Sequence, residues 1–236
     1  MEEYIKQSEP EFDQFASDYR QIHTENINKV SGADSEYFSE YKIKEIKDRV
    51  DTAPSAWLDL GCGDGLTAKF VRQYFPDAEY KGIDVSDSSI QEARARGISS
   101  AEFSVYDGKN FPFPDNTFDV VFSACVFHHI PPEERDGILD ECYRVLKPGG
   151  KFIVFEHNTY NPVTRKIVRD CIFDANAILL NEGRFKKQIR SHGFRSVLRR
   201  FTVFFPRKKP FMWLVRHEHL LRWCMFGGQY YIAAEK

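Results

Sequence analysis

A single glycine-rich turn, Gly61-Cys62-Gly63-Asp64-Gly65, constrains this 236-residue chain more than any other feature. It follows the apolar run 57–60 and precedes Leu66, where a helical pattern begins, so a strand, a turn and a helix succeed one another. Glycine lets the main chain turn sharply and approach a ligand closely. An acid, Asp84, closes the next apolar run 19 residues after Gly65, a spacing that suits the hydroxyls of a ribose. The segment predicts a site for a nucleoside-containing cofactor.

Apolar runs and helical patterns alternate along the chain from residue 36 onward. Strands that alternate with helices imply right-handed crossovers and a mostly parallel sheet that is covered on both faces. The runs that we expect to form strands are residues 57–60, 80–85, 102–106, 118–125, 151–156, about 194–205 and 229–234. The sequence therefore predicts an α/β fold with a doubly wound, mostly parallel sheet. Its last strand follows Gly227-Gly228 and could pair antiparallel at or near the edge.

Capping and breaking residues mark the expected helices. Ser35 and Ser86 are suited to begin helices, and Gly97 to end one. The expected helices of the core are 35–50, 66–75, a helix between Ser86 and Gly97, and 132–147. The length fits a single domain. Within it we expect a helical N-terminal cap at 1–50, a cofactor-binding core at 51–158, and substrate-side insertions at 159–192 and 206–228, the first of them basic and helical.

The net charge of −2 hides a strong asymmetry. Residues 161–236 carry 16 Lys/Arg and 5 Asp/Glu, a net charge of +11. A field of one sign can attract an anionic acceptor, phosphate groups or lipid headgroups, although an ordinary solvated face explains it equally well. The basic side chains that could form a rim for such an acceptor are Arg165, Lys166, Arg169, Arg184, Lys186, Lys187 and Arg190. The aromatic side chains Tyr160, Trp213, Trp223 and Tyr230 are expected mainly to pack the insertions.

Cysteine usage and hydropathy narrow the class of protein. The five cysteines form no Cys-x-x-Cys pair, which argues against a zinc knuckle or a disulfide framework, and we expect no metal. The acidic N-terminus shows no apolar signal segment, and no apolar run approaches the length that spans a bilayer. The simplest location is the cytoplasm.

Carboxylates around the glycine turn narrow the choice of cofactor. Nicotinamide dinucleotides favour Gly-x-Gly-x-x-Gly, in which helix amides hold a pyrophosphate. Here Asp59 stands two residues before Gly61 and Asp64 lies inside the turn, and negative charge there would repel a pyrophosphate. It suits instead a ligand with a cationic ammonium and a sulfonium group, S-adenosyl-L-methionine. A dehydrogenase is the weaker alternative.

Six short motifs occur in a fixed order within residues 57–156. They are Leu58-Asp59-Leu60-Gly61-Cys62-Gly63-Asp64-Gly65, Gly82-Ile83-Asp84-Val85-Ser86, Tyr106-Asp107-Gly108, Phe118-Asp119-Val120-Val121-Phe122-Ser123, His128-His129-Ile130 and Arg144-Val145-Leu146-Lys147-Pro148-Gly149-Gly150. As a set they resemble the class I S-adenosylmethionine-dependent methyltransferases of the small-molecule type. The resemblance implies a Rossmann-like sheet of seven strands with an antiparallel last strand. It also implies S-adenosyl-L-homocysteine as the product.

The resemblance assigns cofactor contacts as well. Asp84 would accept hydrogen bonds from both ribose hydroxyls, and Asp107 would bind the adenine amino group, although an Asp-Gly turn is the alternative. Asp59 or Asp64 would contact the ammonium group. Residues 12–19 and 37–42 resemble segments that close over the cofactor. The full set expected to contact the cofactor is Tyr19, Tyr41, Asp59, Gly61, Cys62, Gly63, Asp64, Asp84, Val85, Tyr106, Asp107, Gly108, Ser123, Ala124 and His129.

The candidate catalytic residues lie at or just after the ends of two expected strands, at the edge of the sheet where ligands bind in open α/β folds. They are His128, His129, Glu156 and His157. Methyl transfer from a sulfonium needs alignment above all, and a hydroxyl acceptor needs a base in addition. Histidine suits that role near neutral pH. The sequence leaves open which histidine serves, with Glu156 orienting or replacing it.

The leading function is methyl transfer to a small acceptor, which could be anionic or linked to a lipid or sugar. The protein could also contact anionic lipid or phosphate groups at its surface. Two alternatives stay open. One is a nucleic-acid methyltransferase that uses the basic C-terminal third. The other is a cofactor-binding protein without activity. The acceptor, the methylated atom and the oligomeric state do not follow from the sequence.

Overall fold

The computed structural model describes residues 32–47, 49–50, 54–171 and 174–236. Two predictions fall outside these ranges. The expected cofactor contact of Tyr19 and the segment 12–19 that was expected to close over the cofactor lie in residues 1–31.

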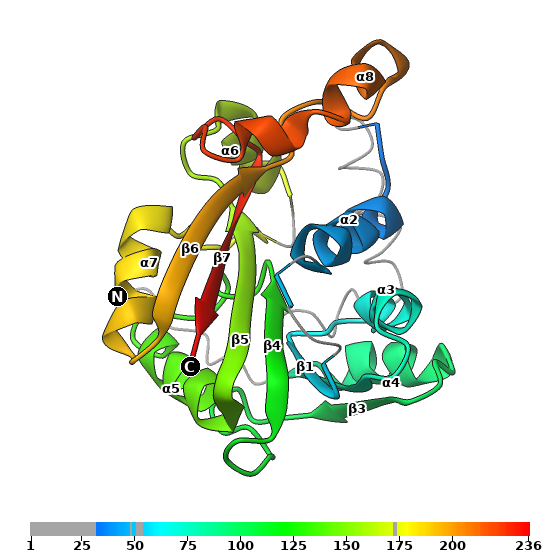
Figure 1. Ribbon diagram of the computed structural model, residues 1–236, viewed down its shortest axis with the longest axis vertical. Coiled ribbons are helices and arrows are strands. Elements are labelled where there is room, and N and C mark those ends of the chain that lie inside the picture. Colours follow the sequence, from blue (N-terminus) through cyan, green and yellow to red (C-terminus); the bar gives the residue numbers. More distant parts are fainter. Residues whose placement is uncertain (1–31, 48, 51–53, 172–173) are drawn as a thin grey trace, which may run out of the picture.

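A seven-stranded sheet forms the centre of the molecule, in the order β3-β2-β1-β4-β5-β7-β6 (Figure 1). Strands β1 to β5 are parallel, and β7 lies between β5 and β6, antiparallel to both. The strands are β1 (Ala56–Leu60), β2 (Glu79–Asp84), β3 (Ala101–Val105), β4 (Phe118–Ala124), β5 (Leu146–His157), β6 (Arg195–Thr202) and β7 (Gln229–Glu235). The predicted class I fold, with its antiparallel last strand, is confirmed.

Helices cover both faces of the sheet and enclose two apolar cores. One face packs against α2 (Ser35–Lys47), α3 (Leu66–Tyr74) and α4 (Asp87–Ala95), and the other against α5 (Arg135–Val145) and α7 (Glu182–Ser191). The Ser86 hydroxyl accepts a hydrogen bond from the main-chain N–H of Ser89, so it caps α4 as expected. The apolar faces of these amphipathic helices thus pack against the sheet and form the expected layers.

Several boundaries differ from the expected ones by up to three residues, and the largest difference is at the start of β5. Strand β5 begins at Leu146, five residues before the expected start, because Leu146 pairs with Phe118 of β4. The main-chain N–H of Gly149 also donates to the carbonyl of Lys236, and that of Lys236 donates to Gly150. The strand is therefore extended by pairing with residues far away in the sequence, which local propensity cannot reveal.

The insertions lie beyond the end of β5. The expected helical stretch 159–192 is divided into α6 (Pro162–Arg169) and α7. Between β6 and β7 the chain forms η2 (Lys209–Phe211), α8 (Met212–Val215) and η3 (Glu218–Leu221). In Figure 1, α6 and α8 lie at the same end of the molecule. None of the helices in the described part of the chain is long and apolar enough to cross a membrane.

The aromatic residues of the insertions do not all pack as expected. Tyr230 is fully buried in the core, but Tyr160, Trp213 and Trp223 are 43%, 64% and 77% exposed. The packing role expected for these three is therefore wrong. Trp213 and Trp223 belong to a segment that leaves the sheet between β6 and β7, so they have little structure to pack against.

Candidate active site

The glycine turn after β1 has the left-handed backbone that only glycine adopts readily. The φ angles of Gly61, Gly63 and Gly65 are +69°, +53° and +73°. A Cβ atom at Gly61 would collide with the side chain of Val126, so the turn touches the loop after β4. A Cβ atom at Gly63 would meet nothing within 4 Å. The turn is therefore packed on one side and faces open space at Gly63.

Asp84, at the end of β2, is bonded to this turn. Its Oδ2 accepts a hydrogen bond of 2.9 Å from the main-chain N–H of Gly63, and its Oδ1 accepts one of 3.0 Å from Ser86. The next residue, Val85, is 37% exposed although it is apolar, and it lies against Gly108. The structure thus places the predicted ribose ligand and another residue of the predicted cofactor set at the same edge of the sheet.

The two other acids of the motif have different surroundings. Asp59 is buried and accepts a hydrogen bond from the Tyr80 hydroxyl. Burial raises the pKa of Asp59 to about 7, and the charge of Asp84 acts in the same direction. Asp64 forms an ion pair with Arg96, the residue that ends α4. The carboxylate of Asp64 therefore already has a cationic partner, whereas that of Asp59 is bonded to a neutral hydroxyl.

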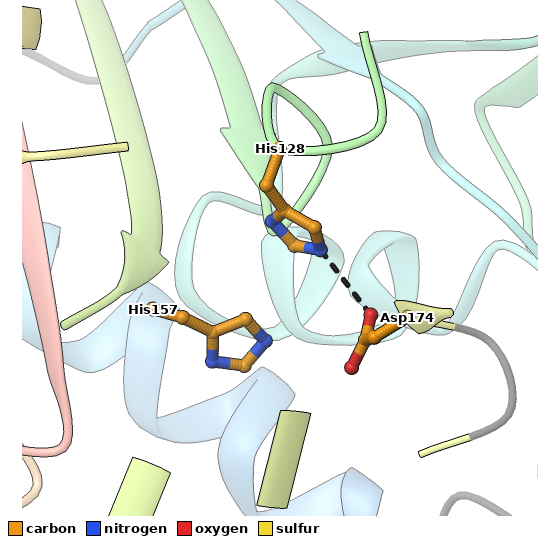
Figure 2. Close-up of side chains that lie close together, drawn as sticks. All are labelled: His128, His157 and Asp174. Carbon is orange, nitrogen blue, oxygen red and sulfur yellow. Dashed lines mark ion pairs between the residues drawn. The ribbon is translucent and has the colours of Figure 1, made fainter. Parts of the chain in front are cut away.

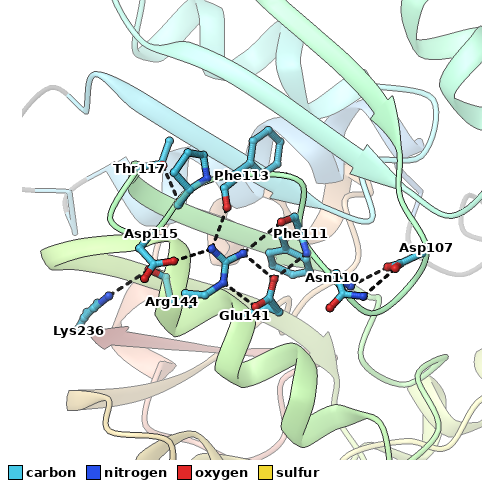
Figure 3. Close-up of polar contacts among 10 residues, drawn as sticks. Asp107, Asn110, Phe111, Phe113, Asp115, Thr117, Glu141, Arg144 and Lys236 are labelled. Atoms are coloured by element: carbon cyan, nitrogen blue, oxygen red, sulfur yellow. Dashed lines mark hydrogen bonds and ion pairs between the residues drawn. The ribbon is translucent and has the colours of Figure 1, made fainter.

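Asp107 and Gly108 follow β3 in a loop that the rest of the chain holds firmly (Figure 3). Asp107 accepts hydrogen bonds from the main-chain N–H groups of Lys109 and Asn110 and from the Asn110 amide, which lower its pKa to about 2. It therefore organises a turn, which was the alternative to adenine binding. A remaining lone pair could still accept a bond from a ligand.

Arg144 of α5 fixes the same loop and was not assigned a role from the sequence. It donates to the carbonyl oxygens of Phe111 and Phe113 at 3.1 and 2.8 Å and pairs with Asp115 and Glu141. Figure 3 shows these bonds converging on the guanidinium group. The available sequence signal for this role was that Arg144 is the first residue of the motif 144–150.

Strand β4 supplies a buried polar atom without a partner. Ser123 lies beside Leu60, the last residue before the glycine turn, and its Oγ atom has no hydrogen-bond partner among the described residues. A buried orphan hydroxyl is costly unless a ligand or water satisfies it. Together with the open space at Gly63 and the exposed Val85, it fits a polar, nucleoside-sized group at this edge. The neighbouring Ala124 is half-buried, and Cys62 is buried in a core with its pKa raised by burial.

His128 and Glu156 form a buried pair between the ends of β4 and β5. The Nδ1 atom of His128 lies 2.6 Å from Oε2 of Glu156, and both side chains are almost completely buried. Glu156 also accepts a 2.8 Å hydrogen bond from the main-chain N–H of Phe127. Burial alone would lower the pKa of His128, but Glu156 and Asp174 together raise it to about 10. His128 is therefore an imidazolium near pH 7.

His157, His129 and Asp174 complete the cluster around this imidazolium. Figure 2 shows His128, His157 and Asp174 directed toward one another. The Oδ1 atom of Asp174 lies 3.4 Å from Nε2 of His128 and 3.5 Å from Nε2 of His129. Burial, together with the charge of His128, lowers the pKa of both His129 and His157 to about 4, so both are neutral near pH 7. The structure thus brings together all four predicted catalytic residues.

Asp174 is the member of this cluster that the sequence did not indicate. The main-chain N–H of Ile178 donates to the carbonyl of His128 at 2.8 Å. Arg135 bonds the carbonyls of Ile130 and Ile178 at 2.9 and 3.0 Å. These bonds hold the segment that carries Asp174 against the loop after β4. The sequence signal for Asp174 was weak, because it is one of three acids in the insertion 159–192.

His128, His157 and Asp174 could also hold a metal ion, because one ligand atom from each lies within 4.8 Å of the others. No metal was expected from the sequence. A metal would require His128 to lose the proton that Glu156 and Asp174 stabilise. Glu156 and Asp174 thus favour a proton on His128, and this proton competes with a metal ion for the same imidazole.

Two predicted cofactor residues have other partners. The ring of Tyr41 lies beneath the guanidinium of Arg207 at 5.2 Å, in the region of the C-terminal insertion. Tyr106 packs edge-on against Phe111 at 5.6 Å, and burial raises the pKa of its hydroxyl. Their contacts with a cofactor remain predictions, as do those of the whole predicted set.

Comparison with known proteins agrees with this arrangement. Residues 58–154 match the family model described as "Methyltransferase domain". A fatty-acid O-methyltransferase from Mycolicibacterium smegmatis is 38% identical over 97 residues, which are 41% of this chain and 35% of that protein. A demethylmenaquinone methyltransferase from Symbiobacterium thermophilum is 37% identical over 105 residues, 42% of this chain and 41% of that protein. The chain thus matches less than half of the length of these relatives.

Solved structures show the same fold. A SAM-dependent methyltransferase from Archaeoglobus fulgidus superposes with a TM-score of 0.70 at 17% identity, covering 89% of this chain and 97% of that one. Phosphoethanolamine N-methyltransferase 2 from Haemonchus contortus, in complex with S-adenosyl-L-methionine, gives 0.62 at 19% identity, covering 91% and 60%. The family match agrees with S-adenosyl-L-methionine as the predicted cofactor. Residues 58–154 match a methyltransferase domain, and the chain has the fold of the class I S-adenosylmethionine-dependent methyltransferases.

Proposed function

We propose that this chain transfers the methyl group of S-adenosyl-L-methionine to a hydroxyl oxygen of a small acceptor that is linked to a lipid or a sugar. The observation that carries this proposal is the histidine–carboxylate cluster beside the glycine turn. Gly61 packs against Val126, two residues before His128, so the turn and the cluster belong to one site. A hydroxyl acceptor is the class of acceptor that needs such a base.

The chain's own residues would position the donor. When bound, S-adenosyl-L-methionine supplies an electrophilic methyl group and a neutral leaving group. Asp84 and the turn at Gly63 would hold the ribose, and Ser123 would gain a partner for its hydroxyl. Asp59 would bind the ammonium group. Rigid positioning of this kind supplies much of the rate enhancement in a displacement reaction.

His157 is the proposed base, with His129 as the alternative. Each is neutral near pH 7 because its pKa is about 4. Asp174 lies beside both imidazoles and would stabilise the positive charge that forms when one of them takes the hydroxyl proton. His128 already carries a proton and is held by Glu156, so its proposed part is to fix the position of Asp174. Glu156 acts through His128 and is a positioning residue.

The chemistry of the relatives supports a lipid-like acceptor. The named relatives include methyltransferases for a fatty acid, for demethylmenaquinone and for a sterol, and each match covers less than half of this chain. No specific observation favours the nucleic-acid alternative. The basic C-terminal third suits an anionic lipid-linked acceptor as well as it would suit a nucleic acid.

The test combines acceptor screening with two histidine variants. The full chain is incubated with methyl-labelled S-adenosyl-L-methionine and a panel of hydroxy fatty acids, quinols and lipid-linked sugars. We expect a labelled ether, a product that survives mild base. We expect His157→Gln to lower turnover by about 100-fold or more while the affinity for the donor, measured by calorimetry, stays within about twofold. The pH–rate profile of the unchanged chain should stay flat down to about pH 5.

His192→Gln is the matched control. His192 also lies between two carboxylates, at 2.6 Å from Asp140 and 2.9 Å from Asp136, but it sits at the end of α7. Its replacement should leave turnover unchanged. A base-labile methyl ester as the only product would contradict a hydroxyl acceptor. If His157→Gln and His129→Gln each lower turnover by less than about threefold, positioning alone would account for catalysis.

A further inference from the structure

The segment between β6 and β7 exposes an unusual number of large apolar side chains. Twelve large apolar side chains are exposed in the described part of the chain, and seven of them lie between residues 211 and 226. These seven are Phe211 (39%), Met212 (44%), Trp213 (64%), Leu220 (62%), Trp223 (77%), Met225 (42%) and Phe226 (66%). Scattered exposed apolar residues are ordinary, whereas a concentration of them marks an interaction surface.

The main chain of this segment is nevertheless firmly held. Glu218 is buried, pairs with Arg207 at 2.6 and 2.8 Å, and accepts hydrogen bonds from the main chain at Phe204 and Phe205. The main-chain N–H of Phe201 donates to the carbonyl of Arg222 at 2.9 Å. Buried polar contacts therefore fix the segment while its apolar side chains stay in solvent. That exposure is built into the fold.

The same surface continues onto α6, beside the candidate active site. Asn161, which caps α6, donates to the carbonyl of Phe226 at 2.7 Å, and Asn158 donates to the carbonyl of Met225 at 2.7 Å. Tyr160 and Val163 are 43% and 51% exposed at this helix start. Figure 1 shows α6 and α8 at one end of the molecule, and α6 follows the strand that ends in His157. We call these nine exposed side chains, Tyr160, Val163 and the seven above, the apolar rim.

The charges around the apolar rim are positive. Residues 206–226 contain five Lys/Arg and a single acid, Glu218, which is buried against Arg207. Lys209 and Arg216 are exposed in this segment, and α6 adds the exposed Arg165. Tryptophan and basic side chains together are typical of proteins that bind the interface of anionic bilayers. Five of the nine rim residues are aromatic and suit the headgroup region, and the methionine, leucine and valine side chains add contacts for acyl chains that base stacking does not use.

We propose that the apolar rim docks the protein on the surface of an anionic lipid bilayer, with the active-site end of the sheet facing the membrane. Trp213, Leu220, Trp223 and Phe226 would enter the headgroup region, and Lys209 and Arg216 would contact lipid phosphates. A membrane-embedded acceptor could then reach the site without leaving the bilayer. The docking surface stands on exposure and charge and does not depend on the proposed acceptor.

The intrinsic tryptophans make the test direct. Trp57 is fully buried, whereas Trp213 and Trp223 are exposed, so a change of emission reports on the apolar rim. The full chain is titrated with vesicles of phosphatidylcholine containing about one third phosphatidylglycerol, and with vesicles of phosphatidylcholine alone. We expect a blue shift and quenching by brominated lipid with the anionic vesicles, and binding at least about tenfold weaker to the neutral ones. Raising the salt concentration should weaken the binding.

Variants separate the apolar and the charged contributions in a co-sedimentation assay. The double variants Trp213→Ala/Trp223→Ala and Lys209→Glu/Arg216→Glu should each bind anionic vesicles at least about tenfold more weakly. The matched control is Val105→Ser/Ile178→Ser, which changes two exposed apolar residues outside the rim that are 41% and 50% exposed. It should bind within about twofold of the unchanged chain. Circular dichroism and thermal unfolding verify that each variant is folded.

Several outcomes would overturn the proposal. These include equal binding to neutral and anionic vesicles, binding to neither, and unchanged binding by the tryptophan double variant. Buried-type tryptophan emission without lipid would mean that another part of the chain covers the rim. A lipid-free dimer that the tryptophan double variant dissociates would assign the rim to a second copy. Displacement from vesicles by single-stranded RNA that itself binds with a steep salt dependence would assign it to nucleic acid. Methyl transfer to a water-soluble acceptor without vesicles would leave the docking result unaffected.

Discussion

Replacing Glu156 with Gln tests the charge state on which the site depends. Glutamine keeps the size of the side chain and an oxygen for the main-chain N–H of Phe127, but removes the negative charge beside His128. Removing one member of a buried ion pair costs about 3–5 kcal/mol. The rise in the pKa of His128 from 6.5 to about 10 corresponds to about 4–5 kcal/mol at 1.36 kcal/mol per unit. We therefore expect Glu156→Gln to lower the free energy of unfolding by about 3–4 kcal/mol near pH 7.

The pH dependence distinguishes this pair from a simple packing defect. A raised histidine pKa stabilises the fold fully below the unfolded value of 6.5 and ceases to do so as the pH rises through about 10. The lowered pKa of Glu156 stabilises the fold above 4.5 and is lost as the pH falls through its lowered value. The difference in stability between the two proteins should be largest between about pH 5 and 6.5. Above pH 7 it should shrink by about 1 kcal/mol or more per pH unit.

The measurement is urea unfolding at pH 6.5, 8 and 9.5, with Glu218→Gln as the matched control. Glu218 is also buried, but its partner is Arg207. The pKa of Arg207 lies above this range, because Glu218 raises it by more than burial lowers it. The cost of Glu218→Gln should stay constant across the three pH values. If the loss of unfolding free energy caused by Glu156→Gln is equally constant, His128 is not protonated and the roles proposed for the histidines are wrong.

Two further predictions concern the cofactor and metal ions. The pKa of Asp59 is about 7 because of burial, so binding of a cationic donor should release about half a proton at pH 7. Calorimetry in buffers of different ionisation enthalpy should show this release for the unchanged chain and for Asp64→Asn, and its loss in Asp59→Asn; equal release in all three would exclude Asp59. Because His128 holds its proton between Glu156 and Asp174, we expect EDTA to change turnover by less than about twofold. Loss of activity that Zn²⁺ or Mn²⁺ restores would show instead that His128, His157 and Asp174 form a metal site.

Local signals predicted most of the sheet. The glycine turn, the alternation of apolar runs with helices and the capping Ser86 each depend on neighbours in the sequence, and each prediction was confirmed. The early start of β5 was missed because it depends on Phe118 and on the C-terminal Lys236, which are distant in the sequence. Register between remote strands follows from packing and is only weakly encoded by local propensity.

The candidate site likewise contains residues that the sequence could predict and one that it could not. His128 and Glu156 could be predicted as neighbours because one follows β4 and the other lies at the end of β5, and the ends of adjacent parallel strands meet at one edge of the sheet. Asp174 could not, because its position depends on the hydrogen bond from Ile178 to His128 and on the side chain of Arg135. Asp64 is the opposite case, a residue that the sequence indicated but that has another partner in the structure. The motif suggested a role at the cofactor, but an ion pair with Arg96 occupies its carboxylate.

The two proposals meet at a single residue, Asn158. It directly follows His157, and its side-chain amide donates to the carbonyls of Met225 and Gly227 at 2.7 and 2.6 Å. The strand end that carries the proposed base is thus bonded to the segment that carries the apolar rim. Asn158 is completely buried, and its bonds fix the two segments to each other. If the rim docks on a bilayer, the contact would fix the height of the base above the headgroups, which suits methylation of a hydroxyl group at the membrane surface.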